Sequence, residues 1–138
     1  MPKPSVTRID FSAFEVGSYQ KWPQFAALYL EDSYVLAISV SSDIIDFRLL
    51  TVLLEGHPCY EPPRAGEHAC YKEATLRFSG VTVADWDRTN APPSVDPDGS
   101  TDLGNIDFFT FEEGRFFLGG DWGEVHIGAK SLVLSVGA

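Results

Sequence analysis

The sequence predicts an all-β fold, either an antiparallel sandwich or a partly closed barrel, with at most one short helix. Apolar and polar residues alternate in short runs, most clearly in Tyr71–Phe78, and a period of two is typical of a half-buried strand. Glycine-containing connections of about three residues separate the last runs, as in an antiparallel meander. Parallel strands need crossovers of about a dozen residues, for which this part of the chain has no room.

The length of 138 residues predicts a single β domain spanning 1–138, with residues 1–5 as a loose lead-in. Hydrophobic residues make up 44% of the chain and aromatic residues 13%, which is typical of a globular domain and not of a disordered one.

Three elements are expected in the first half of the chain. A strand is predicted over 7–16, where the alternation slips at Ala13 and Phe14. A hairpin is predicted from 25–30 and 34–40, with its turn at 31–33. The segment 42–55 is ambiguous: β-branched residues favour a buried strand, and a short helix is the alternative.

The second half begins with an irregular proline-containing loop at 57–70. Strands are expected next at 71–78 and 81–86, followed by a long loop at 89–104. The C-terminal meander is predicted to consist of four strands, at 105–111, 115–118, 124–127 and 131–136.

The charge balance excludes some partners and favours others. Asp and Glu total 20 against 10 Lys and Arg, a net charge of −10, so nucleic-acid binding lacks its electrostatic driving force. A basic protein partner suits this charge. No apolar run approaches the ~20 residues that cross a bilayer, and the N-terminus has no apolar core like that of a secretory signal. No membrane association and a cytoplasmic location are therefore expected, and the two cysteines are expected to be reduced.

Two His-x-Cys pairs form the sharpest candidate site. His57 and Cys59 precede an eight-residue loop that His68 and Cys70 follow. If the two arms pair as a hairpin, all four side chains share one face and are predicted to hold zinc in a tetrahedral Cys₂His₂ site. The alternatives are buried thiols with loop histidines, or a disulfide between the two cysteines.

A calcium loop is a weaker metal hypothesis. Asp96, Asp98, Ser100 and Asp102 place oxygens at alternating positions, with Asp107 in the twelfth place. The glycine usual at the sixth place is missing, so turn chemistry is the preferred interpretation of this segment.

Acidic residues next to tryptophans suggest acid–base chemistry on a sugar platform. The two groups are Asp85-Trp86-Asp87 and Asp121-Trp122-Gly123-Glu124, and the second continues to His126. With 20 acids in the chain such neighbours arise by chance, and no nucleophile elbow or phosphate-binding loop is present. No catalytic residue is therefore assigned.

Adjacent phenylalanines occur in two of the predicted strands. Phe108-Phe109 and Phe116-Phe117 place a ring on both faces of their strands, so both faces need cover from a second layer or a partner subunit. A homodimer through these aromatic faces is one hypothesis. A small-ligand carrier with a cavity lined by Phe108, Phe111, Phe116 and Trp122 is another.

The expected function is a non-enzymatic binding or protein-interaction module, of the immunity or adaptor kind. Zinc binding, with or without catalysis, and ligand carriage are the alternatives. Segments 103–107 and 120–124 are similar to those of small bacterial β domains, a resemblance that implies no activity.

Overall fold

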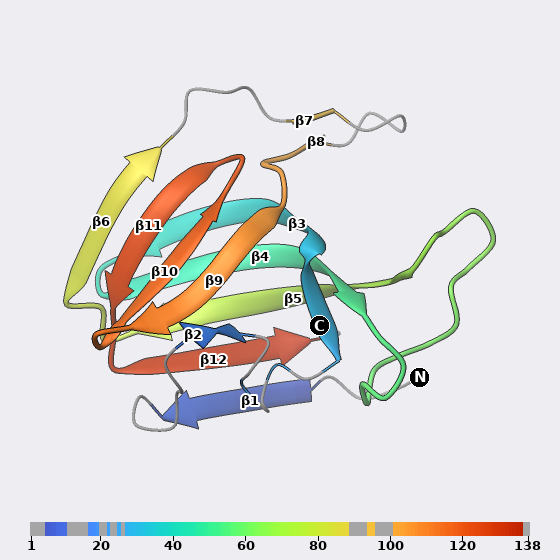
Figure 1. Ribbon diagram of the computed structural model, residues 1–138, viewed down its shortest axis with the longest axis horizontal. Coiled ribbons are helices and arrows are strands. Elements are labelled where there is room, and N and C mark those ends of the chain that lie inside the picture. Colours follow the sequence, from blue (N-terminus) through green and yellow to red (C-terminus); the bar gives the residue numbers. More distant parts are fainter. Residues whose placement is uncertain are drawn as a thin grey trace.

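The computed structural model is an all-β sandwich of two five-stranded antiparallel sheets (Figure 1). It describes residues 5–10, 17–19, 22, 25, 27–88, 94–95 and 101–136, and within these there is no α-helix. The all-β prediction is confirmed, as a sandwich and not as a barrel.

The first sheet has the strand order β1-β12-β5-β4-β3 and the second sheet the order β2-β9-β10-β11-β6. The strands of the first sheet are β1 (Ser5–Asp10), β12 (Ser131–Val136), β5 (Cys70–Ser79), β4 (Ile44–Leu53) and β3 (Leu28–Ser41). Those of the second sheet are β2 (Gly17–Ser18), β9 (Ile106–Glu112), β10 (Arg115–Gly120), β11 (Gly123–Gly128) and β6 (Val83–Arg88). Inside the predicted loop 89–104, β7 (Ser94–Val95) and β8 (Thr101–Asp102) form a separate two-stranded ribbon.

The core lies between the two sheets and is built by the alternation that the sequence shows. In β5, Ala74, Leu76 and Phe78 are buried, and β4 and β12 add buried residues in register with them. Phe109 and Phe116 of the second sheet meet Phe78 with ring centroids 6.2 and 5.3 Å apart. Burial of such rings is the main stabilising term of the fold.

The hairpin predicted with its turn at 31–33 is wrong. β3 runs unbroken through this segment, and its hairpin with β4 turns instead at Ser42 and Asp43. Ser33 is buried, and its hydroxyl donates to Tyr29 O at 2.7 Å and accepts from Val52 N at 2.9 Å. The side chain thus satisfies backbone groups where the register shifts, so a polar residue lies within the strand.

The ambiguous segment 42–55 is a strand, as preferred. Thr51, Val52 and Leu53 are all buried at its C-terminal end, and the Thr51 hydroxyl donates to Lys72 O at 2.8 Å. The run therefore lacks the polar stripe of an amphipathic helix because its end is covered on both faces.

The predicted C-terminal meander is formed by β9, β10 and β11, whereas the fourth strand, β12, crosses into the first sheet. The connections 80–82 and 128–130 cross between the sheets side by side. Thr82 N donates to Gly128 O at 2.8 Å, and Lys130 N donates to Ser79 O at 3.0 Å. As a result β5 pairs with β12 in one sheet, and their continuations β6 and β11 pair in the other.

Asn105 links the two sheets at the opposite corner. Its side-chain amide donates to Glu31 O at 2.9 Å, and its own carbonyl accepts from Trp122 Nε1 at 3.2 Å. Beside it, Val35 exchanges two hydrogen bonds of 2.8 Å with Leu103 and Gly104. These contacts tether β3 to the second sheet without a continuous ladder, so the barrel does not close.

Other expectations fall partly outside the described residues. The N-terminal strand is present as β1, but positions 11–16, with the expected slip, are not described. The segment between Leu53 and Cys70 contains no strand, in agreement with the predicted loop.

Candidate interaction surface

The outer face of the second sheet carries two rows of side chains that run across its strands. One row is Thr110, Phe117, His126 and Asp85, from β9 to β6, and the next is Phe108, Gly119, Glu124 and Asp87. Both rows have the opposite orientation to the buried Phe116, Leu118, Val125 and Ile127. We call these eight residues, together with Glu112 and Arg115, the acidic face.

Two phenylalanines form the apolar part of the acidic face. Phe108 lies across the neighbouring strand, where a Cβ on Gly119 would overlap its ring. Phe117 packs on His126 with ring centroids 4.4 Å apart. Both phenylalanines are half-buried, so their outer cover comes from their own sheet. The other ring of each predicted pair, Phe109 or Phe116, lies in the core.

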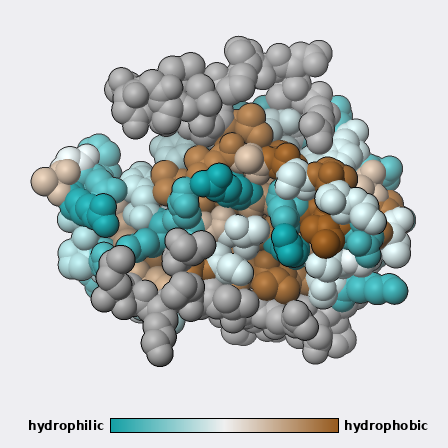
Figure 2. Space-filling model, turned by 180° about the vertical axis from the view of Figure 1, so that it is seen from behind, coloured by the Kyte–Doolittle hydropathy of each residue, from teal (hydrophilic) through white to brown (hydrophobic). Residues whose placement is uncertain are grey.

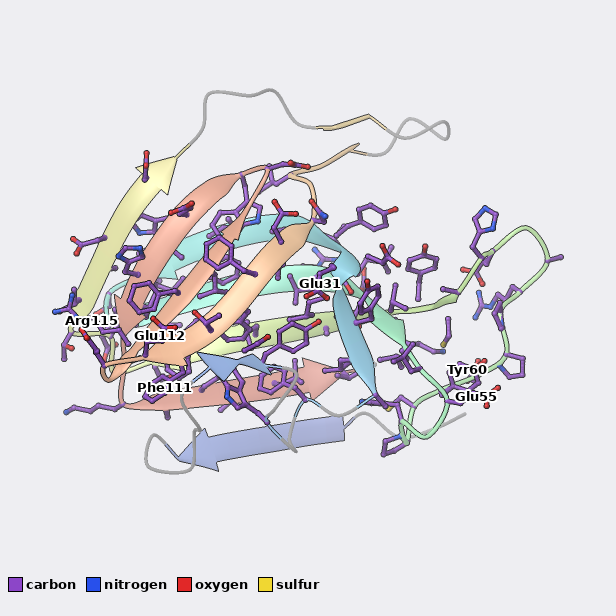
Figure 3. The ribbon with its side chains drawn as sticks, viewed as in Figure 1. Glu31, Glu55, Tyr60, Phe111, Glu112 and Arg115 are labelled. Atoms are coloured by element: carbon purple, nitrogen blue, oxygen red, sulfur yellow. The ribbon has the colours of Figure 1, made fainter. Side chains whose placement is uncertain are left out.

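The carboxylates of this face lie close to one another. Glu124 stands directly opposite Asp87 on the neighbouring strand, and Asp85 stands opposite His126. Like charges in directly opposed positions destabilise a sheet by roughly 0.2–1 kcal/mol. Glu112 and Arg115 flank the turn of the β9–β10 hairpin, where they lie next to each other (Figure 3).

On the outer face of the first sheet, oppositely charged side chains form ion pairs. Arg77 makes a two-pronged ion pair with Asp46, with both N–O distances 2.8 Å, and this contact raises the pKa of Arg77. Arg48 pairs with Glu73 at 3.1 Å. Among the described side chains the third ion pair is Lys72–Glu61, so none of the three involves the acidic face.

Figure 2 shows that the outer face of the first sheet mixes hydrophobic and hydrophilic residues. Tyr29 and Tyr34 are each 37% exposed there, and Tyr71 lies 6.2 Å from Tyr34, ring to ring. Burial and the neighbouring Tyr34 hydroxyl raise the pKa of Tyr71. These tyrosines are a second exposed surface, but its charges are largely paired.

The predicted zinc ligands are placed individually as follows. Cys59 and Cys70 are buried and are not joined by a disulfide, His57 is half-buried, and His68 is exposed. The arms do not pair as a hairpin. Cys59 N donates to His57 Nδ1 at 3.0 Å and Glu61 N donates to Cys70 Sγ at 3.4 Å. Within the described residues no cluster of three or more His, Cys, Asp or Glu is arranged to hold a metal. Zinc binding stays a prediction, which metal analysis of the purified protein tests.

The calcium hypothesis falls mainly outside the described side chains. Asp96, Asp98 and Ser100 are not described, and Asp102 is described only as backbone of β8. Asp107 is an exposed residue of β9.

The two acid–tryptophan groups come together through the pairing of β6 with β11. Asp121 lies in the exposed turn between β10 and β11, and the other acids lie on the face opposite to the tryptophan rings. Trp86 and Trp122 pack on the core side, with centroids 6.4 Å apart and both near Phe47. Asp85, Asp87 and Glu124 point outward, so the indoles provide no platform beside them. The four predicted cavity residues divide in the same way, because Phe108 lies outside whereas Phe111, Phe116 and Trp122 are buried. They do not line one cavity.

The sequence singled out Asp85, Asp87, Glu124 and His126 without bringing them together. Their proximity depends on the pairing of β6 with β11, about which local patterns say nothing. The sequence analysis assigned no role to Gly119. Its role in leaving room for the Phe108 ring follows only from the pairing of these two residues across neighbouring strands.

The chain matches no family model, no curated protein and no solved structure. The described part of the chain also has no helix long and apolar enough to span a membrane.

Proposed function

We propose that this protein is a non-enzymatic interaction module of the cytoplasm, of the immunity or adaptor kind, whose acidic face binds a basic protein. The observation that carries the proposal is the pair Glu124 and Asp87, two carboxylates held opposite each other with Asp85 beside them. This arrangement opposes folding, so stability does not explain it.

A partner's lysine or arginine offsets this repulsion. Guanidinium and ammonium groups donate to carboxylates in strong, charge-assisted hydrogen bonds, and complementary charge also speeds association. Phe108 and Phe117 add apolar area next to the charges, and interfaces typically combine aromatic anchors with a polar surround.

The same charges argue against a homodimer through these phenylalanines. Two copies facing each other would bring together Asp85, Asp87, Glu112 and Glu124 of both chains. Arg115 is the one arginine or lysine of the acidic face, so it does not balance them. Like-charge juxtaposition across an interface costs several kcal/mol. The aromatic rings are therefore assigned to a basic partner.

The cytoplasmic part of the proposal is supported by the state of the cysteines. Cys59 and Cys70 are both buried and are not joined by a disulfide, which suits a reducing compartment.

Affinity capture with the intact chain, followed by binding measurements on the purified partner, tests this function. The double variant D85N/E124Q removes two charges from the acidic face, and we expect it to weaken binding about tenfold at low salt. Salt itself should weaken wild-type binding in the same direction.

The matched control is D46N/E73Q, which removes two charges from the outer face of the first sheet. It should leave the affinity within about twofold of wild type, a difference on the order of 0.4 kcal/mol. A partner that binds D85N/E124Q as well as wild type, or that is indifferent to salt, would show that the acidic face is not the site.

A further inference from the structure

One part of the acidic face combines an aromatic ring with a carboxylate above a bare stretch of backbone. Phe108, Gly119 and Glu124 are consecutive cross-strand neighbours on β9, β10 and β11. Gly119 lies in the outward-facing row and is nevertheless buried. A Cβ added to it would overlap the Phe108 ring and would lie 3.1 Å from Cγ of Glu124. The ring and the Glu124 side chain therefore lie close together above Gly119.

The Phe108 ring differs from the other phenylalanine ring of the acidic face in its surroundings. Phe117 packs on His126, with ring centroids 4.4 Å apart. No described aromatic ring packs on Phe108 in this way. Phe108 is half-buried and its ring rests on Gly119, so its exposed part is on the side away from the sheet. A flat group of a partner can therefore stack on this ring.

The carboxylates next to this ring are also accessible. Glu124 and its neighbour Asp87 on β6 are both exposed. Neither takes part in the three ion pairs found among the described side chains. A cation stacked on Phe108 therefore has one carboxylate beside it and a second carboxylate on the next strand.

This combination suits arginine better than lysine. The guanidinium group is planar and weakly hydrated, so it stacks on an aromatic face, and it donates two parallel hydrogen bonds to a carboxylate. The ammonium group of lysine is compact and strongly hydrated, and it has no flat surface. A ring and a carboxylate side by side therefore serve both properties of a guanidinium, whereas a lysine gains mainly from the charge.

We infer that Phe108, Gly119 and Glu124 form a subsite for an arginine side chain of the partner. The guanidinium stacks on Phe108 and donates to the carboxylate of Glu124, and Asp87 adds negative charge. Gly119 is needed because a larger residue would displace the ring. The inference rests on the proposed function, since it names the residue type that the acidic face recognises.

Two peptides of equal charge test this preference. One consists of four Gly-Arg repeats and the other of four Gly-Lys repeats, both blocked at their ends. Each is titrated into the isotope-labelled full chain, and the backbone amide shifts are followed at low salt. We expect the arginine peptide to bind about fivefold more tightly than the lysine peptide, with the Gly119 amide among those that shift most.

Three variants of unchanged charge locate the preference. F108L removes the ring, and G119A keeps the ring but displaces it, so in both variants the two peptides should bind within about twofold of each other. F117L is the matched control, because Phe117 lies opposite His126 and not opposite Glu124. It should keep the wild-type preference for arginine.

The outcomes separate the subsite from the proposed function. Equal affinity for the two peptides, with D85N/E124Q weakening both, would overturn the arginine subsite and leave the acidic face as the binding surface. An arginine preference that survives in F108L would also overturn the subsite. If neither peptide binds at millimolar concentration, the subsite and the proposed function are both contradicted.

Discussion

At the scale of single residues, Tyr19 shows how one buried hydroxyl serves two neighbouring residues of β3. Tyr19 is fully buried, and its hydroxyl donates to Glu31 at 2.5 Å while it accepts from Leu30 N at 2.9 Å. Removing it leaves a buried backbone N–H without its acceptor.

We therefore expect Y19F to lower the free energy of unfolding by about 1–3 kcal/mol. Y29F is the control, because Tyr29 is 37% exposed, and it should stay within about 0.5 kcal/mol of wild type. Urea unfolding of the three proteins measures both effects. Equal loss in the two variants would show that the Tyr19 hydroxyl has no special role.

His57 links stability to pH. Burial lowers its pKa below the ordinary value of 6.5, and its Nδ1 must be unprotonated to accept from Cys59 N. His57 is protonated more readily in the unfolded chain than in the folded one. Its contribution to the free energy of unfolding is therefore fully present above the ordinary histidine pKa and is lost as the pH falls through the lowered pKa of the folded state.

H57N keeps an acceptor for the backbone of Cys59, as in an Asx-turn, but does not titrate. Between about pH 7 and about pH 5 we expect wild type to lose stability relative to H57N. The control H68N changes an exposed histidine and should follow the wild-type curve. Parallel curves for wild type and H57N would contradict this account of His57.

Glu124 is the residue at which stability and binding are expected to separate. E124Q removes the repulsion from Asp87, so we expect the free protein to gain about 0.2–1 kcal/mol. E73Q instead breaks an ion pair with Arg48 and should lose up to about 1 kcal/mol. Denaturant unfolding at low salt distinguishes the two, and a destabilised E124Q would mean that its carboxylate has a partner within the fold.

At the scale of strands, the bulge between β9 and β10 depends on a glycine. Register shifts between Gly119 and Gly120, and a Cβ at Gly120 would overlap the carbonyl oxygen of Asn105. That carbonyl is held by Trp122, so it has little room to move.

We expect G120A to cost about 1–3 kcal/mol or more, because a backbone atom must shift. At Gly128 the nearest atom to an added Cβ is 3.4 Å away, in ordinary contact, so G128A should stay within about 1 kcal/mol of wild type. Thermal unfolding of both variants checks the contrast, which similar melting temperatures would refute.

Strands were predictable from the sequence where apolar and polar residues alternate within a single strand. The segment Tyr71–Phe78 was predicted, and β5 has the expected buried and exposed faces. The turn at 31–33 was wrong because the sequence cannot show that the Ser33 hydroxyl replaces a backbone partner. The crossing of β12 was missed for a similar reason, since three residues serve a hairpin and a change of sheet equally well.

The candidate site was predictable only in its parts. Charge patterns marked Asp85, Asp87 and Glu124, but the row that joins them requires the pairing of β6 with β11. The zinc prediction assumed a hairpin at 57–70, and the segment instead forms turns that Cys59 and Cys70 anchor in the core.

At the scale of the whole molecule, the sandwich divides charge between its two outer faces. In the first sheet Arg48 pairs with Glu73 and Arg77 with Asp46, and Lys72 pairs with Glu61 of the preceding loop. None of these three ion pairs involves the acids of the acidic face, Asp85, Asp87 and Glu124. A negative field is therefore concentrated on one side, which orients an approaching basic protein.

The most direct test of the acidic face is a map of amide chemical-shift changes when the captured basic partner is added to the isotope-labelled chain. The account predicts that the largest changes fall on β6, β10 and β11, around Asp85, Phe117 and Glu124. Changes centred instead on β3, β4 and β5, around Tyr29, Tyr34 and Tyr71, would contradict it and assign binding to the opposite face.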